Sequence, residues 1–330
     1  MKTMTKDDIV AQLNYLSPSV ESSLYRNGKV FTYRDSDGND SAFTGAEMIR
    51  QQVVINNARA GDKDTISPQL IREGFELFYR PLQNSGLSFF DQQRVLQDYY
   101  PECESIVQKA TGATHVFAFD HNVRSGHKED QKQTENSQAV QQPIQYVHGD
   151  YTLASAPQRL LDLATPPRTN DTLRSILGDD ESLLTNDLVS HVFDNNKRFS
   201  IINVWRNIAS SPVLSNPLAL CDGQSMSQDD LVVFEVRYAD RIGENYFAKH
   251  SPSHQWWYYP KMTRDEVILI KQWDSTGVIN DLGNPNTEQN SVPKNTSCKF
   301  SLHSAFADPT TPQEAPERQS IEVRCMALFD

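Results

Sequence analysis

The sequence has no long apolar run, and its first residues do not form a secretory signal. No stretch approaches the roughly 18 consecutive apolar residues that a membrane-spanning helix needs, and the mean hydropathy is −0.58. The opening residues, MKTMTKDDIVAQLNYL, carry acids early and lack an apolar centre. These absences lead us to expect a soluble, cytoplasmic protein without a membrane partner.

Cysteine and positive charge are also scarce. The chain has four cysteines among 330 residues, and they lie far apart with no CxxC pair, so neither a zinc knuckle nor a disulfide framework is indicated. The formal net charge is −12, from 31 Lys and Arg against 43 Asp and Glu. Nucleic-acid binding relies on a basic footprint that this balance does not supply. We therefore expect a small molecule as the partner, and we leave the oligomeric state open, with a homodimer as one option.

Helical patterns precede strand-like patterns along the chain. Residues 5–60 mix short aromatic runs with turn-forming residues, which predicts an irregular arm. Residues 67–84 and 88–112 carry apolar side chains at helical spacing. HVFAFD at 115–120 is typical of a buried strand. Beyond residue 198, short apolar runs alternate with turn residues, which is the pattern of an antiparallel β-sandwich or barrel.

This order predicts an α+β fold with a mainly β core. We expect residues 1–142 to form an N-terminal arm and helical region that packs on the barrel. Residues 143–330 would form the core itself, and the two parts would make one structural unit.

The stretch His148-Gly-Asp150 places two possible metal ligands two residues apart. In a strand such residues point to the same face, so both can aim at one ion. His303, further along, supplies a second imidazole. Two histidines and one carboxylate are the ligands of many non-haem iron(II) oxygenases, and they leave coordination positions open. We therefore predict His148, Asp150 and His303 as ligands, within a jelly-roll core.

The stretch Arg318-Gln-Ser320 opens the last apolar run, SIEVRCMALF. A bidentate 2-oxo acid and dioxygen would fill the open positions of the metal. The far carboxylate of such an acid needs a fixed cation, and the arginine fork matches a carboxylate best. Ser320 shares the strand face of Arg318 and can add a hydroxyl donor. Arg324 lies on the same face and is a second candidate for the carboxylate.

His254 is a rival for the distal ligand. We prefer His303 because an arginine follows it at a suitable distance on the next strand, whereas the arginine after His254 lies in a turn. His254 then becomes a pocket residue, and the complete set of predicted pocket residues is Tyr146, Asn203, Arg206, His254, Trp257 and Tyr258. An internal ion pair for Arg206 and ordinary barrel core for the aromatic residues remain alternatives, and His121 and Arg124 are either scaffold or pocket wall.

From about residue 70 to the end, the sequence resembles the CmcJ/NvfI (AsaB-like) oxidoreductases, which include the fungal gibberellin desaturase. The matching stretches include Tyr99-Tyr-Pro-Glu102, Phe119-Asp-His-Asn-Val-Arg124, Val147-His-Gly-Asp150, Ile202-Asn-Val-Trp-Arg206, His254-Gln-Trp-Trp-Tyr-Tyr, His303-Ser-Ala-Phe-Ala-Asp-Pro309 and Arg318-Gln-Ser-Ile-Glu-Val-Arg324. Two positions depart from the family pattern, since Glu317 and Asn207 stand where proline is usual. Neither departure removes a ligand.

The resemblance implies a double-stranded β-helix of the cupin-like, jelly-roll type with N-terminal helices. It also implies iron(II), 2-oxoglutarate and O2 as the cofactor and co-substrates, with hydroxylation, desaturation or ring closure of a small metabolite of secondary metabolism. It carries the ligand set onto His148, Asp150 and His303, and the co-substrate site onto Arg318 and Ser320.

Two other functions stay open from the residues alone. One is an iron oxidase or oxygenase that does not use 2-oxoglutarate, in which Arg318 would hold a carboxylate of the substrate. The other is a non-catalytic β-barrel that binds a small molecule, in which the histidines would be structural.

Overall fold

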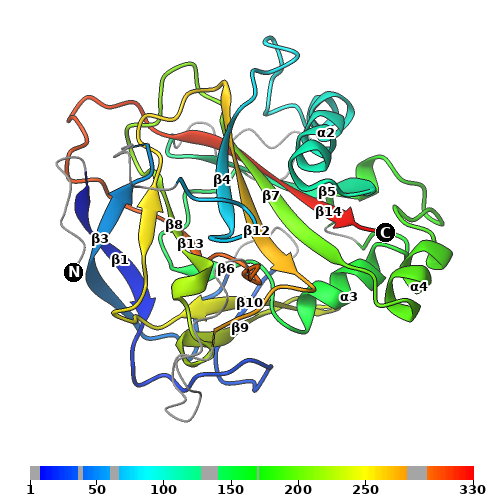
Figure 1. Ribbon diagram of the computed structural model, residues 1–330, viewed down its shortest axis with the longest axis horizontal. Coiled ribbons are helices and arrows are strands. Elements are labelled where there is room, and N and C mark those ends of the chain that lie inside the picture. The colour runs from blue at the N-terminus through cyan, green and yellow to red at the C-terminus, as the bar shows by residue number, and fades with distance from the viewer. Residues whose placement is uncertain (1–7, 36–39, 60–66, 128–139, 169–170, 281–295) are drawn as a thin grey trace.

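The computed structural model describes residues 8–35, 40–59, 67–127, 140–168, 171–280 and 296–330. Most of this part of the chain lies in two β-sheets (Figure 1). The five-stranded sheet has the order β4-β12-β7-β14-β5, and the nine-stranded sheet has the order β1-β3-β11-β8-β13-β6-β10-β9-β2. Side chains from both sheets, among them Trp205 and Leu220, meet in one apolar cluster, so the sheets lie face to face.

The strands of the five-stranded sheet are β4 (Phe75–Tyr79), β5 (His115–Ser125), β7 (Phe199–Asn207), β12 (Glu266–Asp274) and β14 (Gln319–Leu328). The other sheet contains β1 (Ile9–Leu16), β2 (Phe31–Tyr33), β3 (Met48–Asn57), β6 (His148–Gly149), β8 (Leu218–Cys221), β9 (Leu231–Arg237), β10 (Ile242–Ala248), β11 (Trp256–Tyr258) and β13 (His303–Ala305). The helices are α1 (Gln92–Arg94), η1 (Val95–Tyr99), α2 (Tyr100–Thr111), α3 (Ser155–Asp162), η3 (Thr172–Ser175), α4 (Asn186–Asp194), η4 (Gly223–Ser225) and η5 (Gln228–Asp230).

Eight of the strands form a double-stranded β-helix. In chain order they are β5, β6, β7, β8, β11, β12, β13 and β14, and the chain changes sheet at nearly every step. One half of the β-helix pairs as β12-β7-β14-β5 and the other as β11-β8-β13-β6, with every pairing antiparallel. The predicted jelly-roll fold is therefore confirmed. Strand β5 belongs to this core although it precedes the expected boundary at residue 142.

The expectation of an irregular N-terminal arm was wrong. Residues Ile9–Leu16 form strand β1, which pairs antiparallel with β3 along its whole length. The cause can be read in the sequence, because Ile9, Ala11, Leu13 and Tyr15 alternate with more exposed residues at the period of a strand. Strand β3 then runs parallel to β11 and so joins the N-terminal segment to the β-helix.

The helix expected over residues 67–84 was also wrong. Residues Phe75–Tyr79 form β4, an edge strand that pairs antiparallel with β12. Phe75, Leu77 and Phe78 fit a buried strand as well as a helix, and pairing with β12 decided between the two. The helical expectation for residues 88–112 is confirmed by α1, η1 and α2. Pro101 stands in the first turn of α2, where its missing N–H is not needed.

The nine-stranded sheet curls back on itself. Isolated bridges join Asn14 to Tyr146 and Leu16 to Lys249, so β1 lies beside the segments that enter β6 and leave β10. The face of this sheet that points away from the five-stranded sheet therefore encloses a second core. Tyr15 and Trp256 are buried there, with 1% and 0% of their surface exposed.

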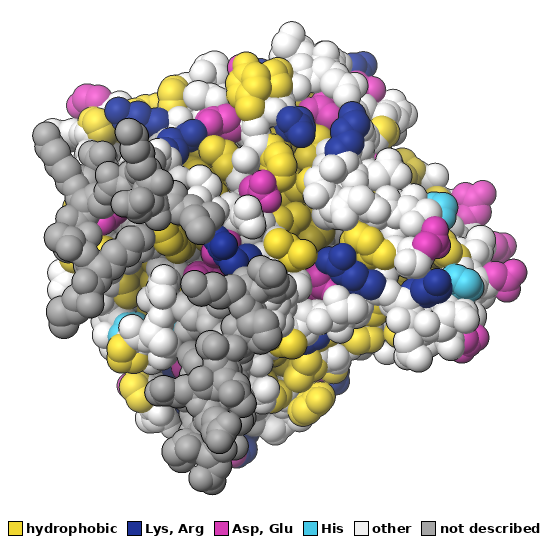
Figure 2. All heavy atoms as spheres, viewed as in Figure 1, with side chains coloured by type: hydrophobic (Ala, Val, Ile, Leu, Met, Phe, Trp, Pro, Cys, Tyr) yellow, Lys and Arg dark blue, Asp and Glu magenta, His cyan; other side chains and the backbone are white. Residues whose placement is uncertain are grey.

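Helix α2 covers the outer face of the five-stranded sheet, as Figure 1 shows. Its buried residues Cys103, Ile106 and Val107 belong to the same apolar cluster as Val323 and Cys325 of β14. On the face of the molecule shown in Figure 2, apolar side chains lie among Lys and Arg side chains. No helix among the described residues is long and apolar enough to span a membrane.

Arg206 joins the sheet to the segment around α2. Its side chain is fully buried, pairs with Glu102 at 2.9 Å and donates to the hydroxyl of Tyr99 and to the backbone oxygens of Arg80 and Arg264. Removing one partner of a buried ion pair leaves an uncompensated charge, which typically costs about 3–5 kcal/mol.

We expect Arg206→Met to lower the free energy of unfolding by about 3 kcal/mol or more. Urea unfolding followed by circular dichroism measures this change. The double variant Arg206→Met, Glu102→Gln should recover part of the loss because it also removes the carboxylate that the single variant leaves unpaired. A loss below about 1 kcal/mol for the single variant would contradict the assigned role.

His121 makes stability depend on pH. Its ring is 3% exposed and lies 2.9 Å from the hydroxyl of Tyr100, and burial lowers its pKa from 6.5 to about 4. Between these two values the unfolded chain binds a proton that the folded chain does not bind, so stability falls as the pH drops from 6.5 to 4.

We expect His121→Gln, which keeps a hydrogen-bonding group beside Tyr100, to show a weaker loss of melting temperature than the unaltered chain over this range. The comparison isolates His121 because every other titrating group is common to both proteins. Parallel melting-temperature profiles for the two proteins would refute the assignment.

Candidate metal centre

His148, Asp150 and His303 converge between the two sheets. The Cα atoms of His148 in β6 and His303 in β13 are direct partners across the antiparallel pair, so their side chains share one face. Asp150 follows β6 by one residue. The ligand atoms of the three residues all lie within 4.8 Å of one another, and the residues are 5%, 8% and 4% exposed.

Hydrogen bonds fix how the two rings are turned. Nδ1 of His148 lies 2.8 Å from the backbone oxygen of Tyr146, which selects the N–H at Nδ1 and leaves Nε2 facing Oδ1 of Asp150 at 3.6 Å. Nε2 of His303 lies 3.9 Å from the same Oδ1. Gln272 of β12 has its amide nitrogen 3.5 Å from Nδ1 of His303, and its amide oxygen accepts from the backbone N–H of Asp150.

Asp150 is held from the opposite sheet. Its Oδ2 accepts from Nδ2 of Asn203 at 2.9 Å and from Nε of Arg324 at 3.1 Å, so Oδ1 remains free to face the imidazoles. The same Arg324 pairs with Asp120 at 2.8 Å. Burial would raise the pKa of Asp150, but the charge of Arg324, the neighbouring imidazoles and the hydrogen bond from Asn203 lower it far below its usual range.

The protonation states suit metal binding. Burial, reinforced by the neighbouring His303, lowers the pKa of His148 to about 4, and burial also lowers the pKa of His303. At neutral pH both rings are therefore neutral and Asp150 is ionised, which are the forms that coordinate a metal.

Arg318 directly precedes β14, and Ser320, Glu322 and Arg324 follow it at two-residue intervals on the face of the strand that points toward Asp150. The guanidinium of Arg318, which is 3% exposed, donates to the backbone oxygen of Asn216 at 2.6 Å and lies 5.6 Å from the ring centre of Trp205. Its Nε is buried without a hydrogen-bond partner among the described residues. Arg318 and Arg324 therefore differ: Arg324 is engaged by protein carboxylates, whereas Arg318 retains an unused donor.

Three of the predicted pocket residues lie on the inner side. Asn203 holds Asp150, as described above. The ring of Tyr146 stacks on Phe247, the Cα partner of His148, with ring centres 6.0 Å apart. Trp257 belongs to the apolar cluster shared by both sheets, which also contains Trp205.

The remaining three pocket residues lie elsewhere, which corrects the expectation for them. His254 hydrogen-bonds with Tyr15 and Asp230 in the second core of the nine-stranded sheet. Tyr258 packs edge-on against Phe306 on that same side of the strand, because it is one residue from Trp257 and so faces the other way. Arg206 is the internal ion pair that the sequence analysis kept as an alternative.

No site role was predicted for Gln272 or Glu322. Glu322 could have been found from its position, because it alternates with Ser320 and Arg324 on one strand face. Gln272 gave no signal, since it lies in an apolar strand in which a β-bulge between Lys271 and Trp273 shifts the register.

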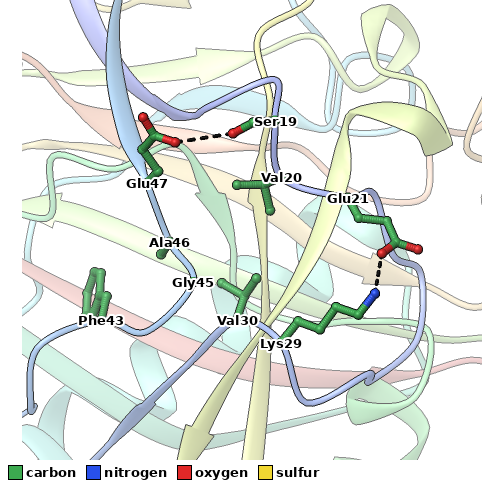
Figure 3. A pocket seen from close by; sticks show the side chains of 9 residues that line it. All are labelled: Ser19, Val20, Glu21, Lys29, Val30, Phe43, Gly45, Ala46 and Glu47. Atoms are coloured by element: carbon green, nitrogen blue, oxygen red, sulfur yellow. Dashed lines mark hydrogen bonds and ion pairs between the residues drawn. The ribbon is translucent and has the colours of Figure 1, made fainter.

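A hollow of about 630 Å³ lies on the surface (Figure 3). It is lined by residues from the segments around β2 and β3, including Phe43 and Val30. Its polar side chains interact in pairs: the hydroxyl of Ser19 donates to Glu47 at 3.2 Å, and Lys29 forms an ion pair with Glu21. The hollow does not contain the three converging residues described above.

This protein carries two histidines and one carboxylate on the inner face of a double-stranded β-helix. That arrangement is typical of the non-haem metal oxygenases. The sequence matches the family described as "Oxidoreductase/YMDC permease-like domain" over residues 13–178 and 181–328. The Fe(II)/2-oxoglutarate-dependent dioxygenase nvfI of Aspergillus novofumigatus is 29% identical over 268 residues, which cover 81% of this chain and 74% of that protein. A protein of the dcmA 3′ region of Methylophilus leisingeri is 50% identical over 61% of this chain and 91% of its own length.

A solved structure agrees with the fold. The iron and alpha-ketoglutarate-dependent endoperoxidase NvfI superposes with a TM-score of 0.66 at 22% identity, covering 98% of this chain and 99% of that one. The chain belongs to the CmcJ/NvfI (AsaB-like) family of iron(II)/2-oxoglutarate-dependent oxygenases.

Because Arg324 orients Asp150, we expect Arg324→Gln to weaken metal binding by roughly ten- to one-hundred-fold, the usual cost of losing a hydrogen-bond partner of a metal ligand. Anaerobic equilibrium dialysis with iron(II) measures this affinity. Arg198→Gln is the matched control, since it removes another Arg–Asp pair, with Asp274 at 2.7 Å, away from the three converging residues. Equal affinities for Arg324→Gln and Arg198→Gln would contradict the assigned role.

Proposed function

We propose that this protein binds iron(II) through His148, Asp150 and His303 and uses 2-oxoglutarate and O2 to oxidise a small-molecule metabolite. The observation that carries the proposal is the convergence of two neutral imidazoles and one ionised carboxylate on one buried point. The two Nε2 atoms lie 3.6 Å and 3.9 Å from Oδ1, and the ligand atoms of the three residues all lie within 4.8 Å of one another. One ion can therefore reach all three atoms.

The co-substrate site would be formed by Arg318 and Ser320. Arg318 offers a buried guanidinium with an unused Nε, and Ser320 lies two residues further along the same face of β14, 1% exposed. A guanidinium fork and a hydroxyl are donors that match a carboxylate. Arg324, which we also predicted for this role, would instead act through Asp150.

When bound, iron(II) and 2-oxoglutarate supply the oxidant by activating O2, with succinate and carbon dioxide as by-products. The chain supplies orientation: Asn203 and Arg324 keep Oδ1 of Asp150 directed at the imidazoles. The apolar side chains of Tyr146, Phe247 and Trp257 would keep water away and place a C–H bond of the substrate.

The relatives support the substrate class. Those at 24–29% identity are named as Fe(II)/2-oxoglutarate- or alpha-ketoglutarate-dependent dioxygenases and as hydroxylase/desaturases. We therefore propose a hydroxylation, desaturation or ring closure on a small metabolite of secondary metabolism. A cytoplasmic location fits the four cysteines, all of which are free and buried.

The test is an anaerobic titration of the purified protein with iron(II) and then 2-oxoglutarate. We expect the visible charge-transfer absorption of a ferrous 2-oxo acid chelate in the unaltered chain and in His254→Ala, whose ring lies outside the site. His303→Ala should lose this absorption and the stoichiometric uptake of iron. Iron uptake without any absorption change on adding 2-oxoglutarate would instead favour an oxidase that does not use this co-substrate.

A further inference from the structure

Arg124 lies beside the proposed co-substrate site, on the neighbouring strand. Its Cα atom is the direct partner of Ser320 across the antiparallel pair of β5 and β14, so both side chains start from the same face. The charged groups that it faces are Glu322, Arg324, Asp150 and Arg34. All but Arg34 belong to the inner face or to the candidate metal centre.

The guanidinium of Arg124 is only partly used. Nη1 donates to the side-chain oxygen of Gln141 at 2.9 Å and to the backbone oxygen of Gln142 at 3.0 Å. Within the part of the chain that the structure describes, Nε and Nη2 have no hydrogen-bond partner. These two nitrogens form the edge of the fork that can grip a carboxylate with two parallel bonds.

The charges around Arg124 and Arg318 do not balance. Neither arginine has a described carboxylate within 4.0 Å. Burial and the neighbouring Arg124 lower the pKa of Arg318, and Glu322 is the acid that acts on both arginines. Arg324 provides the contrast, with Asp120 at 2.8 Å, Asp150 at 3.1 Å and Glu322 at 3.9 Å. Arg318 is buried and Arg124 is half-buried, and the acid near both is Glu322. Positive charge that is left uncompensated beside the buried Arg318 is costly unless an anion completes the site.

We propose that Arg124 and Arg318 together hold the distal carboxylate of the 2-oxo acid, one guanidinium from β5 and one from β14. This inference rests on the proposed function and adds to it a residue that sets the specificity for a dicarboxylic acid. Burial lowers the pKa of both guanidiniums, which agrees with a site that needs an anion.

The arrangement makes a prediction about selectivity. A 2-oxo acid with a distal carboxylate gains charge-assisted hydrogen bonds from both arginines. 2-Oxopentanoate, which has the same carbon chain without that carboxylate, gains none of them. Arg124 should therefore contribute to binding 2-oxoglutarate and contribute little to binding 2-oxopentanoate, although both acids chelate a metal in the same way.

The experiment measures dissociation constants of both acids with the iron(II)-loaded protein under anaerobic conditions, from the visible absorption of the chelate. We expect Arg124→Gln to weaken 2-oxoglutarate by roughly ten- to one-hundred-fold, since hydrogen bonds to charged groups are worth about 1.5–3 kcal/mol. The constant for 2-oxopentanoate should change less than about three-fold by the same reasoning. Arg124→Lys, which keeps the charge without the fork, should give an intermediate loss and also covers the case that Arg124→Gln folds poorly.

Gln141→Ala is the matched control, because it removes a protein partner of Arg124 and leaves the guanidinium in place. If Arg124 only anchors the segment at 141–142, Gln141→Ala will weaken the binding of both acids as Arg124→Gln does. The inference would be overturned if Arg124→Gln changed the dissociation constants of both acids equally, or changed neither. The proposed function would survive that result as long as Arg318→Gln weakened the binding of 2-oxoglutarate more than that of 2-oxopentanoate. If the unaltered chain itself binds both acids equally and Arg318→Gln has no effect, the proposed function fails as well.

Discussion

The two oxygens of Asp150 have different partners, and the geometry of the whole site depends on that division. Oδ2 is bound by Asn203 and Arg324 from the five-stranded sheet, and Oδ1 faces His148 and His303 from the nine-stranded sheet. The carboxylate therefore links the two halves of the β-helix. Since a carboxylate buried this deeply must be paired, the pair with Arg324 both stabilises the ionised form and fixes its direction.

The positions of the two histidines depend on a single strand pairing. His148 and His303 are cross-strand partners, so the pairing of β6 with β13 alone brings two rings to one face with centres 4.3 Å apart. A shift of one residue in that pairing would send one ring to the opposite face. The short strands β6 and β13 are held by longer neighbours, β10 and β8, which fix this register.

Local spacing in the sequence predicted the parts of the site that lie on one strand. His148 and Asp150, like Arg318 and Ser320, follow from the two-residue period of a strand. The pairing partners of these strands could not be derived in this way. Asn203 and Gln272 lie in strands whose other residues are mostly apolar. Their contacts depend on how β7 and β12 pair with distant strands, which the local sequence does not show. For the same reason β4 resembled a helix until its pairing with β12 was known, and His254 and Tyr258 could not be assigned to a face.

Burial of charge explains why the arginines of the five-stranded sheet differ in role. A guanidinium inside a protein is tolerated when acids or carbonyls surround it, as they surround Arg206 and Arg324. Arg206 has its acid, Glu102, on a packed helix, so the pair is permanent and the side chain is structural. Arg124 and Arg318 have carbonyl oxygens for some of their donors and only Glu322 as a shared acid. An anion bound between them would complete the partners of Arg318, whose Nε is buried without a described hydrogen-bond partner. A metal bound at Asp150 would add further positive charge to the same enclosed space and so strengthen the attraction for that anion.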